Sequence, residues 1–326
     1  EEEKARGVVA ASAGNHAQGV ALAAREPIAR TARLHSPGDA PAAIVVDRPG
    51  WIAANIDSMK TLMVPIIEKV SAGSRSGPSA ATAIGGKVTG AEAGAVLSFL
   101  ASKVLGQYDL APDGTPRLLL VAPNVLQAEN EMGLDPGDFR LWVCLHEETH
   151  RVQFTAVPWL RHHMIDRTRT LSTDLAPTPA ELSSRIQEIA RRLPEAFQAG
   201  SQGIGEVFLT PEQRDGVARI TAIMSLLEGH ADVMMDVGPQ VIPTVADIRA
   251  KFSQRRSGVS GLDKVIRRVL GLEAKMRQYR DGAAFVRAVT AKVGTDGFNE
   301  VWTSAETLPL PEEIENPSSW VQRVHG

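Results

Sequence analysis

Length, composition and charge exclude several classes of protein. The chain has 326 residues, of which 43% are hydrophobic and 22% charged, as is ordinary for a globular protein with one large core or two modest ones. The formal net charge of −3 offers no basic field to a polyanion, and no apolar run is long enough to span a bilayer, so we expect neither a nucleic-acid partner nor a membrane protein.

The first residues form a segment with its own resemblance. Residues 1–25, EEEKARGVVAASAGNHAQGVALAAR, resemble the part of threonine dehydratases in which a Ser-Ala-Gly-Asn-His stretch holds the substrate carboxylate beside pyridoxal phosphate. The matching positions are Ser12, Gly14, Asn15 and His16. So short a segment cannot form a cofactor site alone. We therefore interpret residues 1–35 as a helical leader of foreign or fusion origin.

Between residue 36 and Asp135 the pattern alternates between short strands and helices. AIVVD at 43–47 predicts a short buried strand, and WIAANIDSMKTLMVPIIEKV at 51–70 predicts a helix. Residues 71–90 are rich in Gly, Ser and Ala and predict a flexible connection. A helix at about 91–105 and a second strand in PRLLLVAPN at 116–124 follow.

From Asp135 onward the pattern is almost wholly helical. Asp135 and Pro136 form an N-cap and first-turn pair, and the helix they start should run to about Ala156, before Pro158. Similar starts occur at Thr178-Pro179, at Thr210-Pro211 and near Thr244. The pattern predicts a single domain over residues 36–326 that is mainly α (α+β), with a small sheet in its N-terminal half.

The stretch CLHEETHRVQF at 144–154 carries the strongest chemical signal. His146 and His150 are four residues apart on a predicted helix, so both imidazoles face one side and can bind one cation. Glu147 lies about 100° further round, within reach of a water molecule on that cation. Cys144 is the only cysteine and sits in an apolar run. We interpret it as a packed residue, which fits a reducing, cytoplasmic compartment.

A catalytic zinc ion requires a third protein ligand. We assign it to Glu228 in SLLEGHADVMMD, residues 225–236. Asp232 lies one turn later on the same face, where it would hold a ligating imidazole, most plausibly that of His146. The apolar neighbours predict that both carboxylates are buried. His230 is about 200° from Glu228 round the helix, and we leave it as either a packed or a site-lining histidine.

Other ligand sets are weaker. A metzincin would need glycine at position 153 and histidine at position 156, and the chain has Gln153 and Ala156. His162 and His163 stay open as alternative ligands, because Pro158 could fold them back towards His150.

Three motifs together carry a family resemblance. VVDRPGWIAANI, CLHEETHRVQF and LLEGHADVMMD are similar to a family of zincin-like hydrolases of the gluzincin type that is associated with deazaflavin-coenzyme biosynthesis. The resemblance covers about residues 40–320. It implies that His146, His150 and Glu228 bind Zn²⁺ and that Glu147 is the general base.

These observations predict a zinc metallopeptidase that acts on a peptide or protein substrate. Water on the zinc would attack the carbonyl carbon while Glu147 accepts its proton and passes it to the leaving amine. The oxyanion donor stays open among Tyr108, Tyr279, Arg161 and the histidines 162, 163 and 230. One alternative is a zinc-stabilised scaffold without turnover, and another is a pyridoxal-phosphate lyase fragment suggested by residues 1–25. The sequence leaves the oligomeric state open.

Overall fold

The fold was obtained as a computed structural model of the whole chain. It describes residues 19, 21, 23–37, 43–72, 94–175, 209–237, 241–257 and 272–326. The dehydratase-like residues 12–16 and the helix start predicted at Thr178-Pro179 lie outside these ranges. None of the described helices has the length and apolar character needed to cross a membrane.

The described part contains one small sheet. Its strands are β1 (Ile44–Val46), β2 (Gly106–Asp109) and β3 (Arg117–Val121), in the order β1-β3-β2. β1 runs parallel to β3 with Ile44 opposite Leu119, and β2 runs antiparallel to it with Tyr108 opposite Leu118. The apolar run of β3 is buried because β3 is the central strand. β1 was expected to be buried, which is wrong: it is an edge strand, and Ile44 is 44% exposed.

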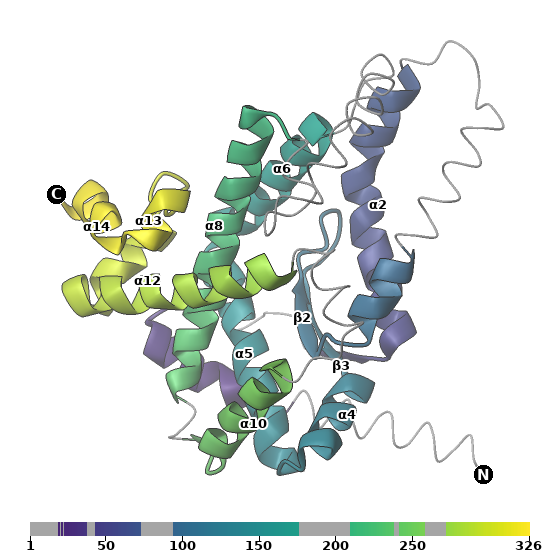
Figure 1. Cartoon of the computed structure of the whole chain (residues 1–326), viewed down its shortest axis with the longest axis vertical. Helices are drawn as coiled ribbons and strands as arrows, with labels where there is room; N and C mark the ends of the chain where they lie inside the picture. The colour runs from purple at the N-terminus through teal and green to yellow at the C-terminus, as the bar shows by residue number, and fades with distance from the viewer. Residues whose placement is uncertain are drawn as a thin grey trace.

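Helices make up most of the remaining described chain (Figure 1). They include α2 (Arg48–Ala72), α4 (Ala122–Met132), α5 (Pro136–Ala156), α6 (Pro158–Leu175), α8 (Pro211–Met234), α10 (Val245–Ser257), α12 (Leu272–Asn299), α13 (Pro311–Glu315) and α14 (Pro317–His325), with 3-10 turns at Met235–Val237 and Glu300–Trp302. The prediction of a mainly α fold with a small sheet in the N-terminal half is therefore confirmed.

Local sequence signals explain where the central helices begin. The Asp135 carboxylate accepts a hydrogen bond from the backbone N–H of Asp138, which caps α5. Thr210 and Gln213 form a reciprocal capping box at the start of α8. Pro158 separates α5 from α6, as the sequence predicts.

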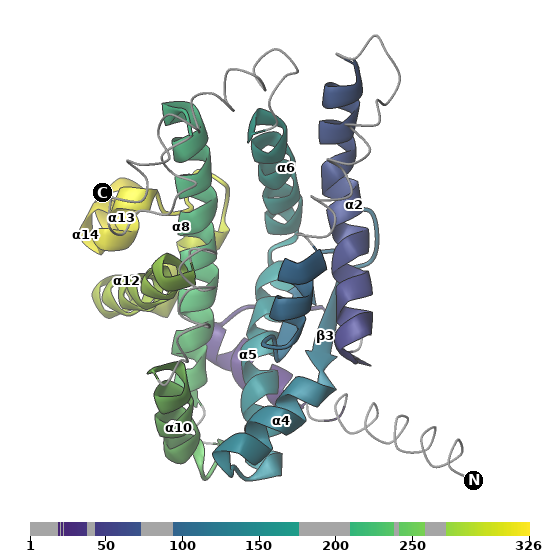
Figure 2. The same cartoon turned by 45° about the vertical axis from the view of Figure 1, so that its right-hand side comes forward.

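Two glycines let α8 and α12 cross at close range. A Cβ atom on Gly229 would overlap the backbone of Gly282, and one on Gly282 would overlap the carbonyl of Ser225. In Figures 1 and 2, α12 lies across α8, with α13 and α14 beside it. On its other side α8 contacts α5 and α6. α8 is thus held from both sides at the turn that carries residue 228.

The leader contributes buried side chains. Residues 23–32 are helical, and Ala24, Ile28 and Ala32 are buried in the same cluster as Phe139 and Leu145 of α5. The helix therefore packs beside the helix that bears the histidine pair. The domain boundary at residue 35 stays a prediction.

Candidate metal centre

α5 presents two imidazoles on one face. His146 and His150 are one turn apart, with ring centroids 5.0 Å apart and ring planes at 89°. His150 is almost buried, with 12% of its side chain exposed, whereas His146 is 31% exposed. Burial lowers the pKa of His150, although the nearby Glu228 carboxylate opposes that effect. A lowered pKa keeps the imidazole uncharged near neutral pH, as a metal ligand must be.

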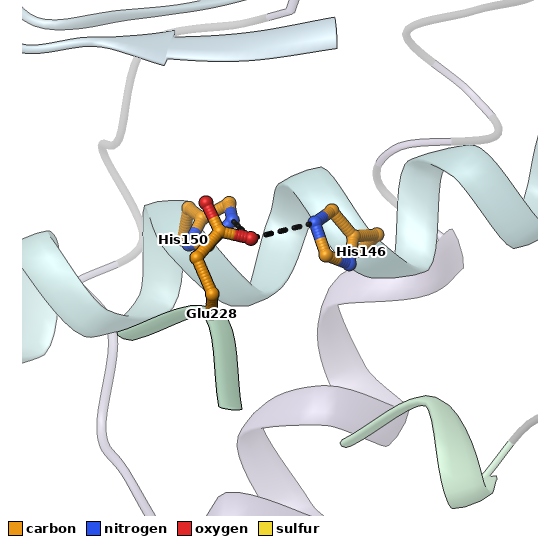
Figure 3. A group of neighbouring side chains, drawn as sticks. All are labelled: His146, His150 and Glu228. Atoms are coloured by element: carbon orange, nitrogen blue, oxygen red, sulfur yellow. Dashed lines mark ion pairs between the residues drawn. The ribbon is translucent and has the colours of Figure 1, made fainter. Parts of the chain in front are cut away.

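α8 brings a carboxylate to the same point. Figure 3 shows Glu228 reaching from α8 to the two imidazoles. Its Oε2 atom lies 3.6 Å from Nε2 of His146 and 3.8 Å from Nε2 of His150. The three donor atoms all lie within 4.8 Å of one another. The structure therefore brings together three side chains that are separated by many residues in the sequence.

The donor set fits a zinc ion. Two imidazole nitrogens and one carboxylate oxygen are typical of catalytic zinc sites, which keep a fourth position open. Zinc bonds of about 2.0–2.1 Å at tetrahedral angles put neighbouring donors about 3.3–3.5 Å apart. The separations of 3.6 and 3.8 Å from Glu228 to the imidazoles are close to that value. A side-chain adjustment that closes the remaining separations, all within 4.8 Å, would let the three donors bind one ion.

Glu147 lies beside these donors in a confined position. The residue is 7% exposed, and a Cβ atom on Gly106 of β2 would lie only 2.6 Å from its Cγ. Burial raises the pKa of Glu147 to about 7; His146 opposes the shift, and the carboxylates of Glu228 and Glu148 add to it. A carboxyl group that titrates near neutral pH can both accept and return a proton.

A cleft of about 450 Å³ opens onto the cluster. It is lined by Glu147 and the three donor residues, by β2 on one side and by apolar side chains. The apolar side chains are Val104, Leu110, Phe154, Met164, Met224 and Leu227. Tyr108 of β2 also lines the cleft and stacks on Phe154, with centroids 5.5 Å apart. The cleft is large enough for a short stretch of peptide backbone with its side chains.

Gln153 is a site residue that the sequence reasoning missed. Its Oε1 lies 3.0 Å from Nδ1 of His150, and its Nε2 donates to the carbonyl of Leu227 at 2.9 Å. The side chain is fully buried. From the sequence, position 153 was considered only because a metzincin would have glycine there. Its spacing of three residues from His150 is the signal that could have found it.

His230 is buried away from the three donors. Its Nδ1 lies 2.9 Å from Nε2 of Gln153, and its ring packs against Phe298 and Trp302. Burial, assisted by the nearby His150, lowers the pKa of His230 to about 3. His230 is thus a packed histidine that contacts Gln153, the hydrogen-bond partner of His150.

Asp232 lies elsewhere than predicted. Its side chain is 58% exposed, and Oδ2 accepts a hydrogen bond from Arg287 of α12 at 3.1 Å. The expectation that Asp232 is buried is wrong. One turn beyond Glu228 the side chain points to the exposed surface beside α12, so Asp232 is a surface ion-pair partner in this structure.

The other candidates are also dispersed. His162 is exposed on α6, and His163 packs edge-on against Trp159. Neither belongs to the group of possible metal ligands found among the described residues. Arg161 donates to the carbonyls of Leu110, Ala111 and Gly114, so it supports the β2–β3 loop.

Comparisons with known proteins found a family model and a solved structure that are similar to this chain. The model of a family described as zincin-like metallopeptidases matches residues 2–321. A crystal structure of a proposed hydrolase with a novel fold from Chloroflexus aurantiacus is similar at 31% sequence identity and a TM-score of 0.67, covering 96% of this chain and 90% of that one. A search of curated proteins gave no match.

Proposed function

We propose that this chain, which belongs to the family of zincin-like metallopeptidases, is a zinc-dependent hydrolase that cleaves amide bonds in peptides. The observation that carries the proposal is the meeting of His146, His150 and Glu228 from two helices at one point, with Glu147 beside them. These residues bring three ligands and a general base into one cleft, as hydrolysis by an activated water molecule requires.

Each residue has a distinct task in the proposed reaction. His146, His150 and Glu228 hold the ion. Zinc, when bound, supplies a Lewis acid that acidifies water and polarises a carbonyl group. The Glu147 carboxylate accepts the proton of the attacking water and delivers it to the leaving nitrogen. Burial raises the pKa of Glu147 to about 7 without metal. A nearby cation lowers that pKa, so Glu147 is ionised and basic at neutral pH in the loaded site.

The cleft indicates the kind of peptide that fits. Most of its lining side chains are aliphatic, aromatic or thioether groups, and its charged lining residues are the acidic Glu147 and Glu228. We therefore expect preferred substrates to carry an apolar side chain next to the cleaved bond. Among the oxyanion donors considered from the sequence, Tyr108 lines the cleft, and we propose it for that role.

Zinc is proposed over other divalent ions. Imidazole nitrogen and carboxylate oxygen also suit other transition metals, but zinc is the ion implied by the family. The association with deazaflavin-coenzyme biosynthesis rests on the sequence resemblance and stays a prediction.

The test separates metal binding from turnover. Glu147→Gln keeps the shape of the side chain but removes the base, so the variant should retain zinc and lose cleavage of a fluorescent peptide library. Glu131→Gln is the control, because Glu131 is exposed on α4. It should match the wild type. Undiminished cleavage by Glu147→Gln would refute the mechanism. A wild-type protein that binds zinc but cleaves no peptide in the library would favour the zinc-stabilised scaffold.

A further inference from the structure

The side chain of Gln153 joins the two helices that carry the donor residues. It projects from α5 and is fully buried. Its Nε2 donates to the carbonyl oxygen of Leu227, the neighbour of Glu228 on α8. Its Oε1 meets His150 on its own helix. One amide therefore contacts a donor residue on α5 and the backbone beside the donor residue on α8.

The hydrogen-bond partners fix the orientation of the amide. A backbone carbonyl can only accept, so the amide group that faces Leu227 is the NH₂ group. The same NH₂ group lies 2.9 Å from Nδ1 of His230, which must then be unprotonated. His230 therefore accepts this hydrogen bond at Nδ1. Both NH₂ protons are thus used.

The remaining oxygen determines which nitrogen of His150 carries the proton. Oε1 of Gln153 can only accept, and it lies 3.0 Å from Nδ1 of His150. The uncharged imidazole must therefore hold its proton on Nδ1 to make this bond. Its Nε2 then keeps a free lone pair, and Nε2 is the atom 3.8 Å from the Glu228 carboxylate.

We propose that Gln153 is a positioning residue of the metal centre, whose amide holds the proton of His150 on Nδ1 and directs the Nε2 lone pair at the ion. The role rests on the proposed zinc site. In this role Gln153 does not bind the ion but orients the imidazole that does. Loss of such a hydrogen-bond partner typically lowers metal affinity by about 10–100-fold.

The first measurement needs neither metal nor a variant. In the ¹⁵N-labelled, metal-free protein at slightly alkaline pH, the imidazole ¹⁵N shifts of His150 should show a protonated Nδ1 and an unprotonated Nε2. Protonation on Nε2 instead would overturn the proposal.

The second measurement uses Gln153→Met, which keeps side-chain length and removes the amide. The variant should lose the fixed Nδ1 proton and bind zinc about 10–100-fold more weakly in competition with a chelator. Gln213→Met is the matched control. Gln213 is also a buried glutamine, but it lies at the start of α8 and its side chain makes two hydrogen bonds, whereas that of Gln153 makes three. It should lose comparable stability and keep both the tautomer and the zinc affinity.

The outcomes separate this inference from the proposed function. Unchanged tautomer and affinity in Gln153→Met would remove Gln153 from the site while leaving the zinc hydrolase intact. If Gln213→Met lost as much zinc affinity as Gln153→Met, the loss would come from general destabilisation of the protein. That result would contradict the positioning role of Gln153. If the wild type binds no zinc, the proposed function fails, and the metal-free tautomer still decides whether Gln153 orients His150.

Discussion

Gly106 of β2 and Glu147 of α5 are in such close contact that position 106 has no room for a side chain. A Cβ atom there would lie 2.6 Å from Cγ and 2.7 Å from Cδ of Glu147. The edge strand thus forms one wall of the pocket that confines the proposed base. Glycine at position 106 leaves the space that the Glu147 side chain occupies.

Gly106→Ala should therefore displace Glu147. We expect the free energy of unfolding to fall by about 1–3 kcal/mol from overpacking, and kcat/KM to fall on the order of tenfold to hundredfold because the base is misplaced. Denaturant unfolding and peptide cleavage measure the two effects. Gly114→Ala in the β2–β3 loop is the control, since its Cβ would lie 3.6 Å from Ala111 Cβ, an ordinary contact. Equal activity of the two variants would contradict the steric explanation.

The α8–α12 crossing should be highly sensitive to an added methyl group. Gly282→Ala would force Cβ into the backbone of Ser225, so we expect a loss of about 3 kcal/mol or more in the free energy of unfolding. Thermal unfolding provides the measurement. Gly94→Ala, on a helical residue with open space around its Cβ, should be neutral or stabilise by up to about 1 kcal/mol. A mild effect of Gly282→Ala would mean that the helices cross farther apart.

Metal binding should distinguish His150 from Asp232. His150→Ala removes a donor and should weaken zinc binding by more than the roughly 10–100-fold expected for an outer partner. Asp232→Asn should leave zinc affinity unchanged, because Asp232 pairs with Arg287 on the surface. Chelator competition monitors both variants. If Asp232→Asn lost zinc as strongly as His150→Ala, the site would have to include Asp232 after all.

The buried His230 should make the metal-free protein sensitive to acid. Burial lowers the pKa of His230 from 6.5 to about 3 in the folded chain. Between these pH values His230 is protonated in the unfolded chain but not in the folded chain. The contribution of the uncharged His230 to the free energy of unfolding is therefore complete above pH 6.5 and is lost as the pH falls towards 3.

His230→Phe removes this titration and keeps an aromatic ring against Phe298 and Trp302. The free energy of unfolding of the variant should therefore fall less steeply than that of the wild type below pH 6.5. Urea unfolding at several pH values, with metal removed, makes the comparison. Parallel pH profiles for the two proteins would show that His230 titrates normally.

Several features follow from the sequence because they are local. Proline and N-cap signals place the starts of α5 and α8, and helical spacing puts His146 and His150 on one face. Backbone geometry within a single helix is enough for each of these statements. The motif on α8 also pointed to Glu228, which lies with both imidazoles in the structure.

Other features were decided by tertiary packing. The sequence of β2, GQYD, has no apolar run, so the strand was not predicted, although it lines the cleft. The spacing of Glu228 and Asp232 is the same whichever way α8 is turned. The rotation of α8 is set by its contacts with α5 and by its close crossing with α12. This rotation turns Glu228 towards the histidines and leaves Asp232 beside Arg287.

The sequence by itself thus determined where the helices α5 and α8 begin, the facing of the histidine pair and the three donor types. Only the tertiary structure decided that Gln153 holds His150, because the partners of its amide, Leu227 and His230, lie on another helix. Sequence spacing specifies the angle between residues on one helix, whereas the rotation and distance between two helices depend on how all their side chains pack.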